Sequence, residues 1–334
     1  MRNKKRPMFA VFGLMTLVLI FTACGGKAAA EHTEPVPTAT FAPVPTATFA
    51  PTPTATFAPT PTITVIQFGT PDSDFAVGVA IDGAGNVYVV GDVQQGALPG
   101  QTSLGDADAY LRKYDGHGKE IWTQQFGTES EDHATGVTAD GAGHLYVVGL
   151  TRGAIDGQAI LVGIDYDAYV RKFDNDGNVL WTRQFGTPHR PGAQGEDLAS
   201  DVSVDGAGNV YVVGFTLGSL PGQADLGADD LYLRKYDSDG NELWVQRSGS
   251  QVADMAHGVA TDGAGNVYVV GDIPGRPGAG EGDAYLRKHD GEGDELWTRR
   301  FGSQSGPSAS GVAVDGEGNV YVVGSVLGAL PGQT

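Results

Sequence analysis

A ten-residue string, Asp-Gly-Ala-Gly-Asn-Val-Tyr-Val-Val-Gly, recurs along this sequence of 334 residues. It stands unchanged at 82–91, 205–214 and 262–271, with near copies at 140–149 and 315–324. Copies that return every 53 to 65 residues indicate a repeat architecture, in which each repeat is one supersecondary unit. The chain is therefore expected to fold as an array of similar modules.

A second string alternates with the first and completes a module of four strands. It reads Asp-Ala-Tyr-Leu-Arg-Lys-Tyr-Asp at 108–115 and has relatives at 167–174, 230–237 and 283–290, each followed by a glycine turn and a Trp-containing segment. In the first repeat we expect strands at 75–81, 86–91, 109–114 and 120–126. Glycine supplies the positive φ angles of tight hairpins, and Asp and Asn bond their own backbone, so the turn at 82–86 is expected to be tight.

Both faces of the second strand are apolar, since Val87 and Val89 alternate with Tyr88 and Val90. A sheet with two apolar faces must be covered on both sides, and stacked sheets satisfy that requirement. The 51 glycines also favour short strands and turns over helices. The pattern predicts an all-β protein with four full repeats and part of a fifth.

These repeats resemble the bacterial β-propeller repeat abbreviated SBBP, which occurs in cell-surface and secreted proteins, and their strand order is similar to that of NHL-type blades. The resemblance covers residues 63–334 and implies a β-propeller of tandem four-stranded antiparallel blades. It implies little about activity, because propellers host many functions. The four tryptophans occupy a position similar to the docking motif of quinoprotein propellers, and we interpret them as interblade packing without a cofactor: Trp122, Trp181, Trp244 and Trp297.

The two ends of the repeat region lack one strand of a closed ring. Residues 63–68 match the fourth strand of a blade, and the sequence stops at Thr334, after the second strand of the fifth repeat. Because an unclosed ring leaves strand edges exposed, we expect this sequence to be a truncated piece of a longer propeller. The alternative is a five-bladed ring with a three-stranded closing blade.

Residues 1–23 have the three parts of a secretory signal peptide. Four basic residues precede an apolar run at 8–21 that is too short to span a bilayer comfortably. The segment Phe21-Thr22-Ala23-Cys24 resembles the bacterial lipobox, with Phe where Leu is most common. That resemblance implies lipidation of Cys24, the only cysteine, and an anchor in the cell membrane or at the cell surface. The alternative is an ordinary secreted protein that is cut after Ala30.

Residues 24–62 form a Pro/Thr-rich linker in which Phe41, Phe49 and Phe57 mark a period of eight. Proline at this density blocks helices and sheet ladders, so we expect a disordered, extended stalk that lifts the folded domain, residues 63–334, off the membrane. The net charge of −19 repels phosphate backbones and anionic headgroups. Nucleic acid is therefore excluded as a partner, and membrane association is left to the anchor.

Catalytic, cofactor and metal sites are not expected. The histidines fall at unrelated repeat positions, so we expect scattered surface residues without a metal cluster or a proton-transfer pair. The stretches 174–178 and 237–241 faintly resemble calcium loops, but their glycine comes at the fourth position, so hairpin turns are expected. The aspartates that open the third strands are expected to bridge to the nearby Arg-Lys pairs on a solvated rim: Asp108, Asp167, Asp230 and Asp283.

The connections after strands two and four are long and differ in every repeat, whereas those after strands one and three are uniformly tight. In a four-stranded meander the two kinds lie at opposite ends of the sheet. Variable loops on a rigid repeated frame are where binding usually resides. We therefore expect a non-enzymatic, surface-displayed scaffold that binds a protein or polysaccharide in adhesion or envelope organisation. The alternatives are a propeller enzyme, such as a lyase or quinoprotein, and a purely structural spacer.

Overall fold

Four consecutive meanders and one hairpin make up the fold in this computed structural model. The structure describes residues 65–158, 166–187, 196–216, 230–248, 254–273, 282–302 and 306–326. Cys24, the signal peptide and the linker lie outside the described residues. Within the described ranges, no helix has the length and apolar character needed to cross a bilayer.

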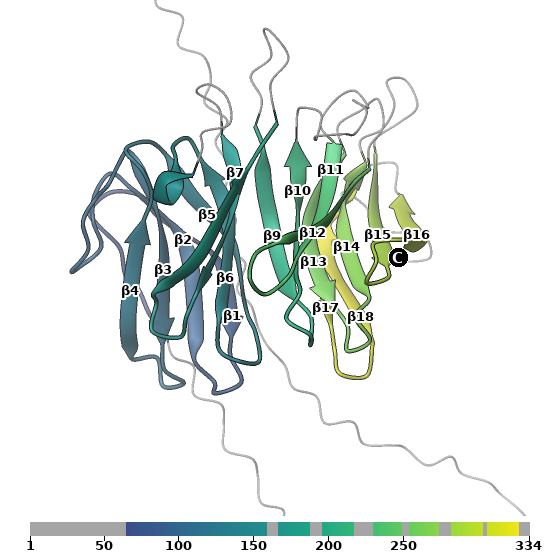
Figure 1. The fold of residues 1–334 in the computed structure, drawn as a ribbon, viewed down its shortest axis with the longest axis horizontal. Coiled ribbons are helices and arrows are strands. Elements are labelled where there is room, and N and C mark those ends of the chain that lie inside the picture. Colours follow the sequence, from purple (N-terminus) through teal and green to yellow (C-terminus); the bar gives the residue numbers. More distant parts are fainter. Residues whose placement is uncertain are drawn as a thin grey trace, which may run out of the picture. The chain divides into compact units, whose positions relative to one another are not determined.

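Each meander is a four-stranded antiparallel sheet whose strands pair in sequence order (Figure 1). We call the four sheets blades 1 to 4 and the final hairpin blade 5. Blade 1 contains β1 (Asp74–Ile81), β2 (Val87–Gln94), β3 (Ala107–Tyr114) and β4 (Glu120–Phe126). Blade 2 contains β5 (Asp132–Ala139), β6 (Leu145–Thr151), β7 (Asp167–Phe173) and β8 (Val179–Phe185).

The same order continues to the end of the described chain. Blade 3 contains β9 (Leu198–Val204), β10 (Val210–Thr216), β11 (Asp230–Tyr236) and β12 (Glu242–Ser248). Blade 4 contains β13 (Met255–Thr261), β14 (Val267–Ile273), β15 (Asp283–His289) and β16 (Glu295–Gly302). Blade 5 contains β17 (Ser308–Val314) and β18 (Val320–Ser325), and a single 3₁₀ turn, η1 (Ile155–Gly157), follows β6. The predicted all-β repeat fold is confirmed, and the strands expected in the first repeat differ from β1–β4 only at their ends.

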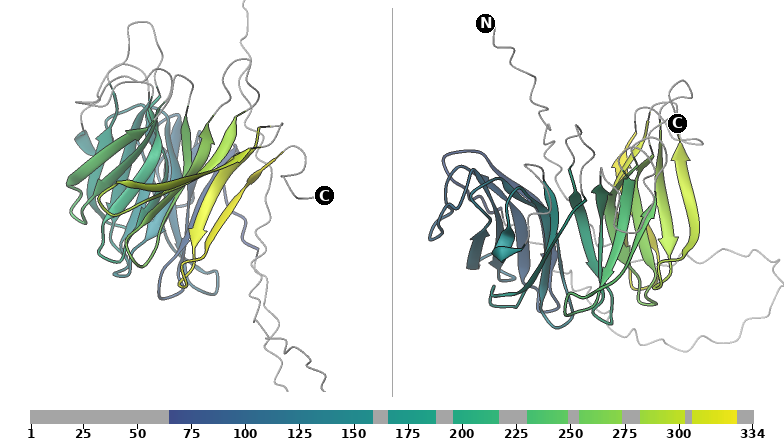
Figure 2. Two further views of the ribbon diagram at one scale, coloured as in Figure 1. Left: turned by 90° about the vertical axis from the view of Figure 1, so that its right-hand side faces the viewer. Right: turned by 45° about the horizontal axis from the view of Figure 1, so that its top comes forward.

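Neighbouring blades meet through their first strands, β1 against β5, β5 against β9, β9 against β13 and β13 against β17 (Figure 2). Glycine makes this approach possible: a Cβ on Gly258 would lie 3.1 Å from the Cα of Gly311, and a Cβ on Gly136 would lie 3.1 Å from the Cα of Asp201. Each of these glycines follows a bulge that shifts the register of the first strand against the second. Asp201 occupies the corresponding position in β9, where the other first strands have glycine.

The apolar core lies between blades rather than inside any one of them. The first cluster joins Tyr88, Val90 and Leu111 of blade 1 to Leu145 and Val147 of blade 2. Similar clusters join blade 2 to blade 3, blade 3 to blade 4 and blade 4 to blade 5. Every residue of β6 is buried, so the expected cover on both faces of the second strand is confirmed in blade 2. In blade 5 it is not met, because most residues of β18 are exposed.

A Trp–Lys pair fastens each of the first two blades to the next. Trp122 Nε1 and Lys113 Nζ both donate to the carbonyl oxygen of Asn175, at 3.2 and 3.1 Å. Trp181 and Lys172 donate in the same way to the carbonyl oxygen of Ser238, at 3.0 and 2.9 Å. The interpretation of the tryptophans as interblade packing is therefore confirmed.

The segment before β1 takes the packing role of a fourth strand without forming one. The ring centroids of Phe68 and Tyr110 lie 5.6 Å apart. The Arg112 guanidinium lies 4.1 Å from the centroid of the Phe68 ring. Phe126, which ends β4, makes the same two kinds of contact with a tyrosine and an arginine of blade 2. Phe185, which ends β8, makes them with blade 3. The expectation that residues 63–68 form a strand is not met over 65–68, because none of the described strands pairs with them.

Candidate binding surface at the variable-loop end

The two ends of every blade differ in how much of their structure the repeat dictates. At one end Asp82 Oδ1 accepts hydrogen bonds from the backbone N–H groups of Ala84 and Asn86, both at 2.9 Å, and Gly85 has φ 83°. Although burial opposes it, hydrogen bonding from Asn86, Tyr88 and Ala84 lowers the pKa of Asp82 to about 2. The same turn recurs in each blade, so this hairpin end is a uniform frame.

The calcium-like stretches belong to that frame. Asp174 Oδ1 accepts from the N–H groups of Asp176 and Asn178, and Gly177 has φ 87°. Asp237 makes the equivalent bonds to Asp239 and Asn241. Since the carboxylates are occupied by their own turns, the interpretation of both stretches as hairpin turns is confirmed.

At the opposite end, which we call the variable-loop end, three side chains of blade 2 form a partly exposed cluster. Glu131 precedes β5, Arg152 follows β6 and Tyr166 precedes β7, so antiparallel pairing brings them to one edge. Arg152 Nη1 lies 2.8 Å from Glu131 Oε2, and its guanidinium lies 4.2 Å from the Tyr166 ring centroid. The Tyr166 hydroxyl donates to the same Glu131 oxygen, and burial together with this carboxylate raises its pKa.

The backbone extends this Glu131–Arg152–Tyr166 cluster to both neighbouring blades. Glu131 forms a parallel bridge with Ala107 of blade 1, and Tyr166 forms one with Glu196, which leads into blade 3. The side chains of Arg152 and Glu131 are 41% and 36% exposed. Arg152 is therefore exposed beside a partly exposed Glu131 and a half-buried Tyr166, and two backbone bridges hold the cluster.

A histidine–aspartate pair lies next to this cluster, across the junction of blades 1 and 2. His133 Nδ1 is 3.3 Å from Asp92 Oδ1, and the His133 ring centroid is 6.1 Å from that of Tyr166. Burial opposes the charged imidazolium, but the hydrogen bond and charge of Asp92 outweigh it and raise the pKa of His133. A half-buried imidazole held by a carboxylate is suited to proton exchange or to hydrogen bonding with a ligand.

A second pair lies at the corresponding end of blade 4. His257 Nε2 is 3.0 Å from Asp272 Oδ2, and Ser308 Oγ of blade 5 donates to the same oxygen at 2.9 Å. Although burial opposes it, these donors lower the pKa of Asp272. The interpretation of the histidines as scattered surface residues is therefore wrong for His133 and His257, whose aspartate partners come from other strands. It is also wrong for His144, which pairs with Asp140 at 2.8 Å, and for His289, which is 7% exposed.

The third-strand aspartates are also placed differently from the prediction. Asp108 and Asp230 are completely buried and Asp167 is 5% exposed, so a solvated rim is wrong for these three. Their partners lie across the sheet, where Gln125 and Gln184 donate to Asp108 and Asp167, both at 2.8 Å, and Arg247 donates to Asp230. In the described ranges, no group of three or more His, Cys, Asp or Glu side chains is arranged to hold a metal ion.

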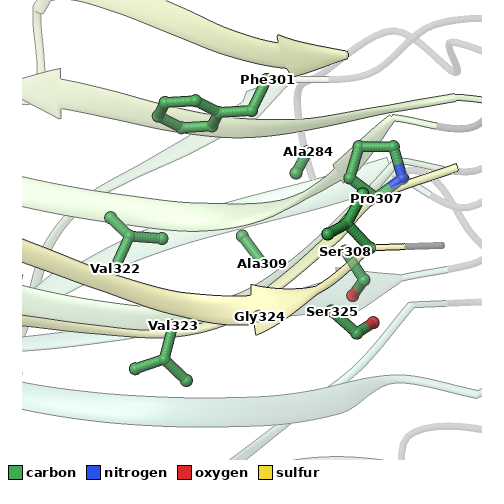
Figure 3. A pocket seen from close by; sticks show the side chains of 10 residues that line it. Ala284, Phe301, Pro307, Ser308, Ala309, Val322, Val323, Gly324 and Ser325 are labelled. Atoms are coloured by element: carbon green, nitrogen blue, oxygen red, sulfur yellow. The ribbon is translucent and has the colours of Figure 1, made fainter. Parts of the chain in front are cut away.

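An apolar pocket of about 300 Å³ lies beside β18, and its lining residue Ser308 also donates to Asp272 of the second pair (Figure 3). Ala284 and Phe301 of blade 4 lie on the same side of β18 as Val322 of blade 5, whereas the Val323 side chain points away from them; Ser308 and Ser325 contribute hydroxyls to the lining. None of its ten lining residues is charged. The pocket therefore offers contact area rather than acid–base chemistry.

Comparisons with known proteins agree with the repeat architecture. Residues 65–92, 180–221 and 296–325 match the family described as SBBP, beta-propeller repeat. "Regulatory protein FlaEY" of Caulobacter vibrioides is 31% identical over 216 residues, which cover 60% of this chain. The match covers only 22% of that relative, so the chain spans about a fifth of its length.

Solved structures with a similar chain trace share little sequence with it. A protein of unknown function from Dyadobacter fermentans has a TM-score of 0.44 and 12% identity, and the match covers 76% of each chain. A protein of unknown function from Bacteroides caccae has a TM-score of 0.30 and 15% identity, covering 71% of this chain and 85% of the other. An apocarotenoid oxygenase mutant from Synechocystis has a TM-score of 0.37 and 15% identity, covering 72% and 53%.

Proposed function

This chain is a β-propeller repeat protein of the SBBP type, and from that premise we propose that it is a non-enzymatic binding scaffold. It would bind a protein or polysaccharide through the variable-loop end, in adhesion or envelope organisation. The observation that carries the proposal is the contrast between the uniform hairpin end and the partly exposed Glu131–Arg152–Tyr166 cluster at the other. Sugar rings stack on aromatic side chains, and their hydroxyls bond to charged groups, so a polysaccharide suits this cluster well.

Display outside the cell is part of the same proposal. Cys24 would carry the lipid anchor, and residues 24–62 would hold the propeller away from the membrane. We would express the full chain with its own leader beside Cys24→Ser and measure intact mass and partition into membranes. Lipid mass and membrane partition in the wild type alone would support the anchor, whereas two soluble products cut near Ala30 would contradict it.

The binding role is tested with the full chain against arrayed envelope polysaccharides and surface proteins. Tyr166→Ala and Arg152→Ala are expected to weaken a captured ligand at least tenfold, because each removes one of the exposed contacts. The control is Asn178→Ala at the hairpin end, which alters a turn on the uniform frame. Equal binding by all variants, or no ligand for the wild type, would count against the proposal.

The His133–Asp92 pair favours one competing function, a propeller lyase that uses this imidazole for proton transfer. His133→Gln distinguishes the two proposals, because a lyase would lose turnover of a cleaved polysaccharide while still binding it. A scaffold would show no cleavage in either protein. Release of unsaturated sugar products, followed by their ultraviolet absorbance, is the readout.

A further inference from the structure

In blades 1 to 4, a glycine of the second strand lies directly opposite a tyrosine of the third strand. The pairs are Gly91 with Tyr110, Gly149 with Tyr169, Gly214 with Tyr232 and Gly271 with Tyr285. A Cβ built on any of these glycines would lie between 2.7 and 2.9 Å from the hydroxyl oxygen of its tyrosine. The tyrosine side chain therefore runs across its glycine, and only a residue without a side chain leaves room for it.

Each of these four tyrosines reaches the main chain of its first strand. Their hydroxyls donate to carbonyl oxygens at 2.9 to 3.2 Å, and the acceptors are Phe75, His133, Leu198 and Met255. The four tyrosines are at most 1% exposed, and a buried phenol needs such a partner. We call the second-strand glycine and the first-strand carbonyl oxygen together a tyrosine socket.

At blades 2 and 3 a phenylalanine of the preceding blade adds a third wall to the socket. The ring centroids of Phe126 and Tyr169 lie 6.2 Å apart at an interplanar angle of 83°, and the Arg171 guanidinium lies 4.7 Å from the Phe126 centroid. Phe185 makes both kinds of contact with blade 3. In each blade the arginine follows the tyrosine by two residues, which puts both side chains on one face of the strand. A socket of this kind therefore recognises the sequence Tyr-x-Arg.

Blade 5 has the same socket. A Cβ on Gly324 would lie 2.0 Å from the carbonyl oxygen of Ser308, which is the close approach that the socket glycines of blades 1 to 4 make. Phe301 provides the third wall, since it faces an alanine of β15 as Phe126 and Phe185 face alanines of β3 and β7. In the described part of the chain, β18 pairs with β17 and with no third strand.

The apolar pocket of about 300 Å³ beside β18 is this socket (Figure 3). Gly324, Ser308 and Phe301 all line it. Phe301 is 36% exposed, whereas Phe126 and Phe185 are 6% and 8% exposed. The ring that a tyrosine and an arginine cover at blades 2 and 3 is therefore open to solvent at blade 5.

The Tyr-x-Arg sequence that fills such a socket occurs four times in this chain, at 110–112, 169–171, 232–234 and 285–287. All four copies lie in third strands that already fill the sockets of blades 1 to 4. A second folded copy of the chain has the same four strands in the same places, so it has none to contribute. The occupant that fits is an extended segment of another protein, and the net charge of −19 favours a basic one.

We propose that the pocket beside β18 binds an extended segment of a partner protein that carries tyrosine, an aliphatic residue and arginine in succession. The segment adds to β18 as an antiparallel strand, as β15 adds to β14. Its tyrosine runs across Gly324 and donates to the Ser308 carbonyl oxygen, while its arginine lies over the Phe301 ring. Main-chain hydrogen bonds along the strand edge supply affinity, and the socket supplies specificity. The site uses no residue of the Glu131–Arg152–Tyr166 cluster and goes beyond the binding role proposed for it.

The test titrates the full chain into a fluorescently labelled peptide, Asp-Ala-Tyr-Leu-Arg-Lys-His, which has the sequence of residues 283–289. Fluorescence anisotropy gives the dissociation constant. Phe301→Ala in the protein is expected to weaken binding at least tenfold, because it removes the wall that both the tyrosine and the arginine contact. Tyr285→Phe in the peptide should weaken binding about fivefold, the effect of one lost hydrogen bond, and Arg287→Gln should weaken it as well.

Phe75→Ala is the matched control, since it removes a ring that is 49% exposed on blade 1. It should leave the dissociation constant unchanged. A photoreactive benzoylphenylalanine in place of Tyr285 of the peptide locates the site without relying on the fold of a variant. The crosslink is expected on β16, β17 or β18.

Three results would overturn the proposal. One is the absence of binding at millimolar peptide. Another is a crosslink in blades 1 to 3, or equal binding by the wild type and Phe301→Ala. The third is a chain that self-associates, dissociates on Phe301→Ala and is unaffected by the peptide, which would assign the pocket to a second copy.

Discussion

At the scale of single residues, the departures from the repeat carry more information than the repeat itself. Asp201 stands where Gly78, Gly136, Gly258 and Gly311 stand in the other first strands, and it accepts hydrogen bonds from the N–H groups of Val202 and Val259 at 2.8 and 2.9 Å. Desolvation outweighs these two donors and raises the pKa of Asp201 to about 6. An alignment of the repeats identifies the substitution, but only the approach of β13 to β9 explains its effect.

Asp201→Asn is therefore expected to stabilise the protein at alkaline pH. The folded pKa of Asp201 lies above its unfolded value, so its ionisation costs stability as pH rises through about 6. The neutral amide avoids that cost, which is on the order of 1–3 kcal/mol at pH 8, and it has little effect at about pH 3, below the unfolded pKa of ~4. Urea unfolding at these two pH values measures the difference in the free energy of unfolding. An Asn variant that is no more stable than the wild type at pH 8 would show that ionised Asp201 does not destabilise the fold.

At the scale of strands and turns, the sequence predicted the fold closely and the site poorly. Glycine, Asp and Asn determine the hairpins through local bonds, and alternating apolar residues determine the strands, so both follow from short stretches of sequence. The Asp92–His133 pair depends on which blades lie side by side, and no local pattern encodes that. Asp272 and His257 lie in one hairpin, so their pairing follows from its register. The Asp92–His133 pair could have been found by comparing each polar residue at the end of a second strand with those at the start of the next blade's first strand.

The Trp–Lys contact belongs to this scale and is open to measurement. Trp181→Phe keeps most of the ring packing against Tyr146, 6.0 Å away, but removes the Nε1–H that donates to Ser238. We expect a loss of about 1 kcal/mol, the usual net value of one hydrogen bond. Chemical denaturation measures it, with Leu180→Ala, an exposed neighbour on the same strand, as the control. A loss no larger than that of the control would show that ring packing alone joins these blades.

At the scale of the whole molecule, stability is shared between neighbours because the four largest apolar clusters each span two blades. Gly214→Ala tests this, since a Cβ there would clash with the carbonyl oxygen of Leu198 and lie 2.7 Å from the Tyr232 hydroxyl. We expect it to lower hydrogen-exchange protection in blades 2 and 4 as well as in blade 3.

Gly324→Ala, the same change in blade 5, provides the comparison. It should affect blade 4 and leave blades 1 and 2 protected, because blade 5 shares its cluster with blade 4. Protection lost only in blade 3 for Gly214→Ala, or lost equally everywhere for both variants, would contradict a nearest-neighbour array.

The Trp–Lys contact also bears on how such a chain can evolve. The acceptor shared by the two blades is a main-chain oxygen, supplied by Asn175 in one blade and by Ser238 in the next, and the Asn175 side chain only adds a second acceptor for Lys113. A duplicated module would find its docking partner in any neighbour without a compensating mutation. Gene segments that encode one blade can thus be copied, lost or exchanged while the joint is preserved, and the loops at the other end are left to diversify.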